Sequence, residues 1–216
     1  MNGVYHRIYS PVSSQYRGPA FFLDRDGVLV EETGYLHRPE DLRILDGAAE
    51  AVLTLNRAGI PVVVVTNQGG IGLGYYSWSD FEALQEALAL KLLEHGARLN
   101  AVWACACHPG AAGEFHAENH SHRKPNPGML LEAATELNLD LSRSWMVGDK
   151  PSDIEAGLEA GVRKVFHVLT GYGDQTRHEV KEAFRGHSQV AYCADLRAAV
   201  ALALGDGYRA LENKRP

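Results

Sequence analysis

Residues 61–67 read PVVVVTN, a run of four valines that stops at two polar residues. Branched apolar residues on both faces are typical of a parallel strand that is buried on both sides. Shorter apolar runs, also predicted to be strands, occupy 20–24, 101–106, 144–149, 164–169 and 189–193. Helical spacing of apolar residues is found over 46–58, 79–95, 128–137, 153–160 and 195–204. This alternation predicts an α/β fold with a doubly wound, mainly parallel sheet.

Two helix starts have local signals. Asp46 is the expected N-cap of the first predicted helix, because a short acidic side chain can accept from free backbone N–H groups. Ser79-Asp80-Phe81-Glu82 matches a capping box and is expected to open the second helix.

The chain length of 216 residues suits one domain. The sequence contains no internal repeat, low-complexity segment or linker. Residues 1–18 are mostly polar and are expected to form an N-terminal surface arm. Residues 19–216 are expected to form a single domain that acts as a monomer.

The charge pattern argues against two classes of partner. The net charge is −6 and no long basic run is present, so neither a nucleic acid nor a membrane is an expected partner. The first 18 residues lack the apolar core of a signal peptide, and no apolar run approaches the roughly 20 residues of a membrane helix. The three cysteines do not form a disulfide framework, which favours a reducing, cytoplasmic location.

Four predicted strands end in the same way, with polar, charged or glycine residues directly after the apolar run. The endings are Asp24-Arg25-Asp26-Gly27, Thr66-Asn67-Gln68-Gly69-Gly70, Cys105-Ala106-Cys107-His108 and Gly148-Asp149-Lys150-Pro151-Ser152-Asp153. In an open parallel sheet the carboxyl ends of the strands form the binding crevice. These four segments are therefore expected to meet at one site.

The residue types at this site indicate phosphoryl transfer. Clustered carboxylates from Asp24, Asp26 and Asp149 require a hard cation, and Mg²⁺ fits because it combines a few carboxylates with water and phosphate oxygens. The hydroxyl of Thr66 can donate to phosphate oxygens, and Lys124 supplies a positive charge. One carboxylate can form an aspartyl phosphate, while a second exchanges protons with the leaving group and water.

The ordered motifs DxDG, TN, Lys-Pro and GDxxxD resemble those of the haloacid-dehalogenase-type phosphatases over about residues 20–173. The resemblance implies a Rossmann-like fold. It also implies Asp24 as nucleophile, Asp26 as general acid and base, and Thr66 and Lys124 as holders of the transferred phosphoryl group. Asp149 would ligate Mg²⁺ with Asp24 and the main-chain carbonyl of Asp26, and Asp153 would support the metal from outside.

A finer resemblance is carried by residues 22–48, 66–81 and 123–134. They are similar to the small capless branch that contains the D-glycero-D-manno-heptose-1,7-bisphosphate 7-phosphatases and the histidinol-phosphate phosphatases. About 40 residues separate Asp26 from Thr66, which leaves no room for a large cap. The implied activity is removal of the 7-phosphate of the heptose bisphosphate. The alternatives are a histidinol-phosphate or broader phosphatase and, from another class, an inactive zinc-stabilised binding module.

A loop at 105–122 carries candidate ligands for a second metal. In the branch, a loop with Cys-x-His and then Cys-x-Cys binds zinc just before Arg-Lys-Pro. The matching positions here have three residue types exchanged, and they are Cys105, Cys107, His120 and His122. Thiolate and imidazole both suit Zn²⁺, so the resemblance implies a closed, structural Cys₂His₂ site. His108 and His116 are alternative ligands, and a flexible loop without metal is the other interpretation.

The remaining polar residues near these motifs are candidates for substrate contacts. Arg123 suits bidentate binding of a second phosphate, although it could also be a solvated surface residue. Further candidate contacts are Asn67, Gln68, Lys150 and His37. Leu73 stands where relatives usually have an arginine, which removes one anion contact. Cys193 follows a late strand and is expected to fill a buried position.

Overall fold

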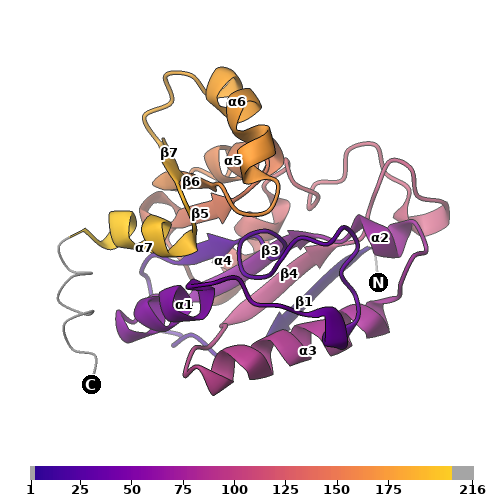
Figure 1. Cartoon of the computed structure of the whole chain (residues 1–216), viewed down its shortest axis with the longest axis horizontal. Coiled ribbons are helices and arrows are strands. Elements are labelled where there is room, and N and C mark those ends of the chain that lie inside the picture. Colours follow the sequence, from indigo (N-terminus) through magenta and orange to yellow (C-terminus); the bar gives the residue numbers. More distant parts are fainter. Residues whose placement is uncertain (1–2, 206–216) are drawn as a thin grey trace.

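The computed structural model describes residues 3–205. In this part of the chain seven strands form one sheet in the order β1-β4-β3-β2-β5-β6-β7. The strands are β1 Val4–Ile8, β2 Phe21–Leu23, β3 Val62–Asn67, β4 Ala101–Cys105, β5 Trp145–Gly148, β6 Lys164–Val168 and β7 Val190–Cys193. All neighbouring pairs are parallel except β1 and β4 (Figure 1). The predicted α/β fold with a mainly parallel sheet is confirmed.

Helices cover both faces of this sheet (Figure 1). One face carries α1 Ala48–Arg57, α3 Trp78–Glu94 and α7 Leu196–Leu204, and the other carries α4 Gly128–Leu137, α5 Pro151–Glu159 and α6 Gly173–Ala183. Shorter helices are α2 Gly69–Gly72, η1 Pro39–Asp41, η2 Gly113–Phe115 and η3 Leu141–Arg143. The valines of β3 show why this strand is central: Val62 and Val64 pack into one core cluster, and Val63 and Val65 into the other.

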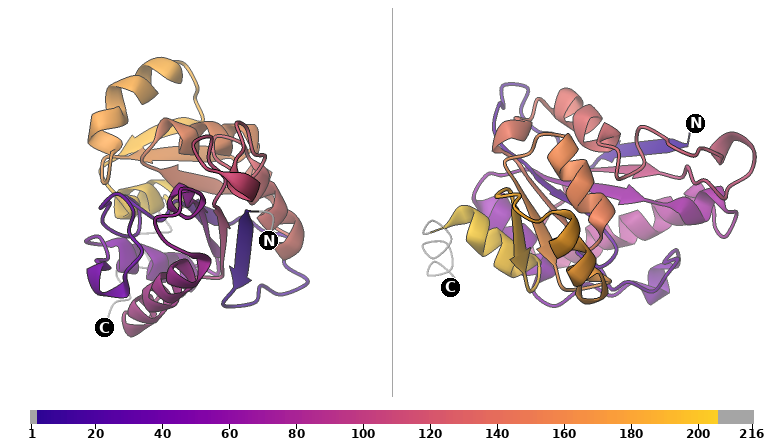
Figure 2. Two further views of the ribbon diagram at one scale, coloured as in Figure 1. Left: turned by 90° about the vertical axis from the view of Figure 1, so that its right-hand side faces the viewer. Right: turned by 90° about the horizontal axis from the view of Figure 1, so that it is seen from above.

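The N-terminal segment differs from the prediction. Residues 4–8 form an edge strand that pairs antiparallel with β4, so the expected surface arm is wrong for this stretch (Figure 2). Its side chains explain the pairing. Tyr5 is buried and stacks on Trp78 with ring centroids 5.5 Å apart, while His6 stacks on Trp103 at 5.4 Å. Aromatic pairs of this kind favour a strand that the polar sequence alone does not indicate.

Both predicted helix caps are also corrected. The N-cap of α1 is Gly47, which has a φ of 74°. The helix therefore begins without a side-chain cap, and Asp46 does not cap it. The capping box of α3 is Ser77 with Asp80, two residues earlier than expected. This earlier start places Trp78 on the helix, where its ring can contact Tyr5. The helix α6 was not predicted, because it is a polar helix in which only Gly173 and Val180 are buried.

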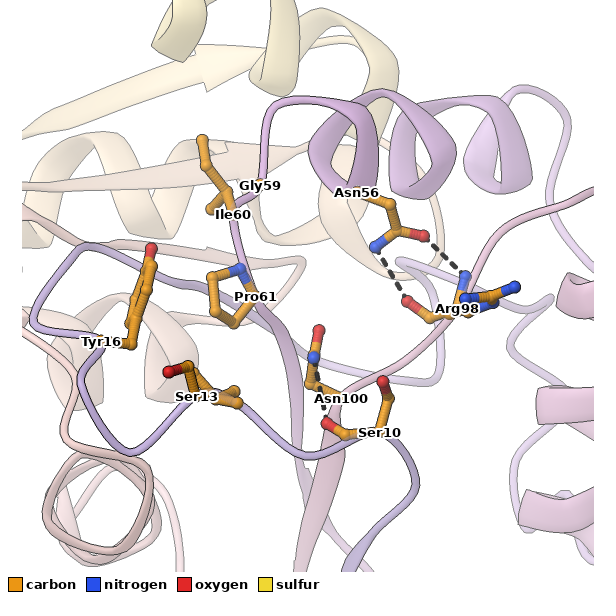
Figure 3. A pocket seen from close by; sticks show the side chains of 10 residues that line it. Ser10, Ser13, Tyr16, Asn56, Gly59, Ile60, Pro61, Arg98 and Asn100 are labelled. Carbon is orange, nitrogen blue, oxygen red and sulfur yellow. Dashed lines mark hydrogen bonds between the residues drawn. The ribbon is translucent and has the colours of Figure 1, made fainter.

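The amino-terminal ends of β3 and β4 border a cavity of about 280 Å³ (Figure 3). Two of the polar side chains that line it, those of Asn100 and Asn56, form hydrogen bonds within the fold. Asn100 donates to the carbonyl of Ser10 at 3.1 Å, and Asn56 exchanges two hydrogen bonds with the backbone of Arg98. The Asn100 bond holds the segment after β1 against the sheet, and the Asn56 bonds connect the end of α1 to the residues before β4, both at the end opposite to the predicted site. None of the helices described here has the length and apolar character needed to cross a membrane.

Candidate active site

The carboxyl ends of the parallel strands meet as predicted. Asp24 and Asp26 follow β2, Thr66 lies at the end of β3, and Asp149 follows β5. Asp153 lies in the first turn of α5, and Lys124 precedes α4. Each strand is buried, so its last residue can hold a polar side chain at the crevice with little freedom to move.

Lys124 is the electrostatic centre of the site. Its side chain is buried, and its ammonium lies 2.9 Å from Asp24 Oδ1 and 2.6 Å from Asp153 Oδ1. It also donates to the carbonyl of Val65 at 2.9 Å. Burial lowers the pKa of Lys124, but the carboxylates of Asp153 and Asp24 outweigh burial and raise it above its ordinary value. Lys124 therefore stays charged.

Asp24 is ionised because two lysines lie near its carboxylate. Burial alone would raise the pKa of Asp24, but the positive charges of Lys124 and Lys150 outweigh burial and lower it below the ordinary value. A buried carboxylate that remains charged and has only part of its hydrogen-bonding capacity occupied is a competent nucleophile.

Asp24, Asp149 and Asp153 bring carboxylate oxygens within 4.8 Å of one another. Asp149 Oδ2 accepts from the backbone N–H of Tyr172 at 2.7 Å, whereas Asp149 Oδ1 is buried and has no hydrogen-bond partner among residues 3–205. Burial, with the nearby charges of Asp24 and Asp153, raises the pKa of Asp149 to about 8. A buried oxygen without a donor beside other carboxylates fits a hard divalent cation such as Mg²⁺.

Two glycines leave space for the Asp149 carboxylate. Gly27 and Gly171 have φ values of 83° and 59°, and a Cβ on either would lie 2.3 Å from Asp149 Oδ2. Only glycine suits both the backbone conformation and the close approach.

Asp26 is held by a partner to which the sequence analysis assigned no role. The buried guanidinium of Arg25 donates from Nε to Asp26 Oδ1 at 3.0 Å and from Nη2 to Asp26 Oδ2 at 2.9 Å. Gln68 Nε2 lies 3.3 Å from Asp26 Oδ2 and donates to Thr66 Oγ1 at 2.8 Å. The only sequence signal for this pairing was an arginine placed between two acids after a buried strand.

Asn67 holds the backbone of Lys124 in place. Its side chain donates from Nδ2 to the carbonyl of Lys124 at 2.9 Å and accepts at Oδ1 from the N–H of Lys124 at 3.0 Å. This pair of bonds connects the end of β3 to the loop before α4. The amide that the sequence offered as a substrate contact is therefore engaged within the protein.

A cavity of about 420 Å³ lies over these residues and is lined by Asp26, Glu32, Tyr35, Arg123 and Lys150, among others. Arg123 Nη1 donates to the carbonyl of Cys107 at 2.9 Å, which fixes it at the wall. Lys150 pairs with Glu32 at 3.0 Å and lies over the ring of Tyr172.

His37 is placed outside this cavity. It stacks on Tyr76 and lines a neighbouring hollow.

The Cys/His loop brings three of the four predicted zinc ligands together. Cys105, Cys107 and His120 offer ligand atoms within 4.8 Å of one another. His122 lies outside this cluster, with its ring centroid 5.7 Å from that of His120 and its Nε2 2.7 Å from Glu132 Oε2. Thiols and imidazoles of this kind suit Zn²⁺.

One ring nitrogen of each alternative ligand, His108 and His116, is engaged within the loop. The N–H of Gly110 donates to His108 Nδ1 at 2.9 Å, and His116 Nδ1 lies 3.2 Å from the carbonyl of Ala111.

Comparisons with known proteins agree with this geometry. A family model described as HAD-hydrolase-like matches residues 121–199. The chain is 44% identical over 187 residues to a D-glycero-D-manno-heptose-1,7-bisphosphate 7-phosphatase of Thermosynechococcus vestitus, with 84% of this chain and 93% of that protein aligned. It is 48% identical over 144 residues to the D-glycero-beta-D-manno-heptose-1,7-bisphosphate 7-phosphatase of Mesorhizobium japonicum, with 67% of this chain and 66% of that protein aligned.

A solved phosphatase structure has a similar fold. The D,D-heptose 1,7-bisphosphate phosphatase from B. bronchiseptica, complexed with magnesium and phosphate, has a TM-score of 0.75 and 28% identity. The match covers 86% of this chain and 98% of that one.

Proposed function

The chain belongs to the haloacid-dehalogenase-type phosphatases and is a phosphoric monoester hydrolase, and from this premise we propose that its substrate is a sugar bisphosphate. The proposed reaction removes the 7-phosphate of D-glycero-D-manno-heptose 1,7-bisphosphate, the activity for which the reported relatives are named. The observation that carries the proposal is that a buried, ionised Asp24 is paired with Lys124. It lies beside Asp149 Oδ1, a buried oxygen that has no hydrogen-bond partner in the described part of the chain.

The proposed reaction has two steps. The Asp24 carboxylate attacks phosphorus, and the bond to the sugar oxygen breaks while Asp26 gives that oxygen a proton. Asp26 then takes a proton from a water molecule that attacks the aspartyl phosphate, which releases phosphate and restores Asp24. The Thr66 hydroxyl and the Lys124 ammonium hold the oxygens of the transferred group.

The family implies Mg²⁺, and Asp24, Asp149 and the main-chain carbonyl of Asp26 would hold it. A bound ion would withdraw charge from the phosphoryl oxygens. Asp153 supports this site through its contact with Lys124 and by accepting the backbone N–H of Lys150 at 3.0 Å.

Two cations in the cavity support the choice of a bisphosphate. Arg123 is fixed by the Cys107 carbonyl, and its guanidinium can bind a second, non-reacting phosphate. Lys150 shares the cavity, where its charge is balanced by Glu32. The histidinol-phosphate, broader phosphatase and inactive-module alternatives are not favoured, because the reported relatives act on the heptose bisphosphate and the catalytic side chains are all present.

We expect kcat/KM for the heptose bisphosphate to exceed that for histidinol phosphate by about 10- to 100-fold, since one charged hydrogen-bonding contact contributes that factor. In Arg123→Gln the advantage should shrink through a higher KM for the bisphosphate. Phosphate release from both substrates measures the ratio, and histidinol phosphate is the internal control because it has no second phosphate. An equal or reversed ratio in the wild-type protein would reject the substrate.

We also propose a structural Zn²⁺ on Cys105, Cys107 and His120, with His122 as the fourth ligand. The His120 and His122 rings are 5.7 Å apart, close to the spacing of about 5 Å expected for two imidazoles on one tetrahedral ion. Glu132 supports this role because a carboxylate on one ring nitrogen orients a histidine whose other nitrogen binds metal. The ion would fix the loop that carries Arg123 and Lys124.

Protein purified without chelator is expected to contain about one equivalent of zinc. The double variant Cys105→Ser, Cys107→Ser should lose the metal, and its melting temperature should fall by at least about 5 °C because the polar loop loses its cross-link. Cys193→Ser removes a buried thiol elsewhere and should retain the metal. Metal analysis and thermal melts test this, and a double variant that keeps its zinc and its melting temperature would exclude the site.

The cysteines also bear on location. Cys105, Cys107 and Cys193 are buried and free, which supports the proposal of a reducing, cytoplasmic compartment. Cys193 packs into the core, as expected.

A further inference from the structure

We propose that Gln68 is a positioning residue. It fixes the side chain of the general acid Asp26 relative to that of the phosphate-binding Thr66. This inference rests on the proposed function, because it assigns Gln68 to the machinery of that reaction. Gln68 was predicted to contact substrate, but it is only 2% exposed.

The carboxamide of Gln68 is fully occupied. Its Oε1 accepts from the hydroxyl of Tyr76 at 2.6 Å and from Arg25 Nη2 at 3.3 Å. Its Nε2 donates to Thr66 Oγ1 at 2.8 Å and to Asp26 Oδ2 at 3.3 Å. Two acceptor sites and two donors are the whole capacity of an amide, so the group has no bond left for a substrate.

The orientation of this amide is forced by its neighbours. The Arg25 guanidinium can only donate, so the oxygen of Gln68 must face Arg25, and its nitrogen then faces Thr66 and Asp26. A reversed amide would place its NH₂ group opposite the guanidinium of Arg25, so that two donors would face one another.

The surrounding structure also prevents movement. The backbone N–H of Gln68 donates to the carbonyl of Cys105 at 2.7 Å. Arg25 lies over the ring of Phe81 and donates to the carbonyl of Leu36 at 3.3 Å. Asp26 is therefore held on one side by a guanidinium fixed in the core and on the other by an amide fixed to the strand ends.

A positioned acid matters only when the leaving group needs a proton. A sugar alkoxide is a poor leaving group and depends on Asp26, whereas a nitrophenolate is stable enough to leave without protonation. Displacement of Thr66 weakens phosphoryl binding for both kinds of substrate alike. The ratio of kcat/KM between the two substrates therefore reports the placement of Asp26 separately from general damage to the site.

The test compares kcat/KM for the heptose bisphosphate and for para-nitrophenyl phosphate in the wild type and in Gln68→Leu, with thermal melts of each protein. We expect a loss of about 100-fold on the sugar phosphate and less than about tenfold on the aryl phosphate, since general acid catalysis contributes on this scale. Gln68→Glu keeps the size and the acceptor oxygens but loses both donated bonds, so it should show the same fall in the ratio if the leucine variant does not fold.

Gln85→Leu is the matched control. Its amide is equally buried and contacts Arg25 at 3.5 Å, but no hydrogen bond joins it to Asp26 or Thr66. We expect this variant to keep the wild-type ratio between the two substrates. An equal loss on both substrates in the Gln68 variants would overturn the positioning role while leaving the phosphatase intact, whereas a wild-type protein that released phosphate from neither would overturn the proposed function itself.

Discussion

Replacing Asp24 by asparagine is expected to reduce phosphate release by about 10⁴-fold or more, because the variant lacks the nucleophile that forms the aspartyl phosphate. The change keeps the size of the side chain, and the amide oxygen can still accept from Lys124, which lies 2.9 Å from Asp24 Oδ1. At saturating Mg²⁺ the loss should appear in kcat, with little change in KM for the sugar bisphosphate. Single-turnover phosphate release on the sugar bisphosphate measures it.

The fold of this variant should be retained. Asparagine removes one of the negative charges that crowd Asp149 and Asp153, but it also removes a charged partner of the buried Lys124, so the variant should remain folded with a lower melting temperature. Asp174→Asn is the control, since it makes the same change at an exposed position on α6. Unchanged turnover in Asp24→Asn would remove Asp24 as the nucleophile and with it the proposed mechanism.

The sequence predicted those parts of the molecule that depend on local patterns. The valines of β3 identified a strand buried on both faces, because burial on both faces leaves no polar position in the run. The acids after β2 and β5 identified the site, because parallel strands direct their carboxyl ends to one edge. The alternation of strands and helices therefore predicted the fold class, and the polar residues at the strand ends predicted the chemistry.

Interactions between distant segments left no such pattern. The strand β1 exists because Tyr5 and His6 meet Trp78 and Trp103, which lie far along the chain. Nothing within residues 1–18 indicates this pairing.

The hydrogen-bond partners within the site could not be predicted from the sequence either, because they come from distant segments. Gln68 could be noticed as a polar residue after β3, but its bonds to Arg25 and Tyr76 appear only when three segments are folded together. His122 was expected to face metal, and its contact with Glu132 depends on the register of α4 against the loop. The sequence identified most of the residues that lie close together, but not His122, and the fold determines which partner each one contacts.

Mg²⁺ is expected to bind the metal-free protein with an affinity that rises by up to about tenfold per pH unit between roughly pH 5 and 8. Burial and the charges of Asp24 and Asp153 raise the pKa of Asp149 to about 8 in the metal-free protein. The ion requires the ionised carboxylate, so below that pH it must displace a proton. Calorimetric titration in buffers of different ionisation enthalpy counts the released proton, and a pH-independent affinity with no release would contradict the assignment.

The same linkage fixes the sign of the stability change. The pKa of Asp149 is higher in the folded protein than the value of about 4 expected for an unfolded aspartate, so the folded state retains the proton longer. Without metal, this contribution to the free energy of unfolding is complete below about pH 4 and is lost as the pH rises towards 8. Saturating Mg²⁺ should remove this slope, and Asp149→Asn should remove both the slope and most of the response to Mg²⁺. Thermal melts across this pH range separate the two proteins, because only the wild type is predicted to gain more from Mg²⁺ at pH 8 than at pH 6.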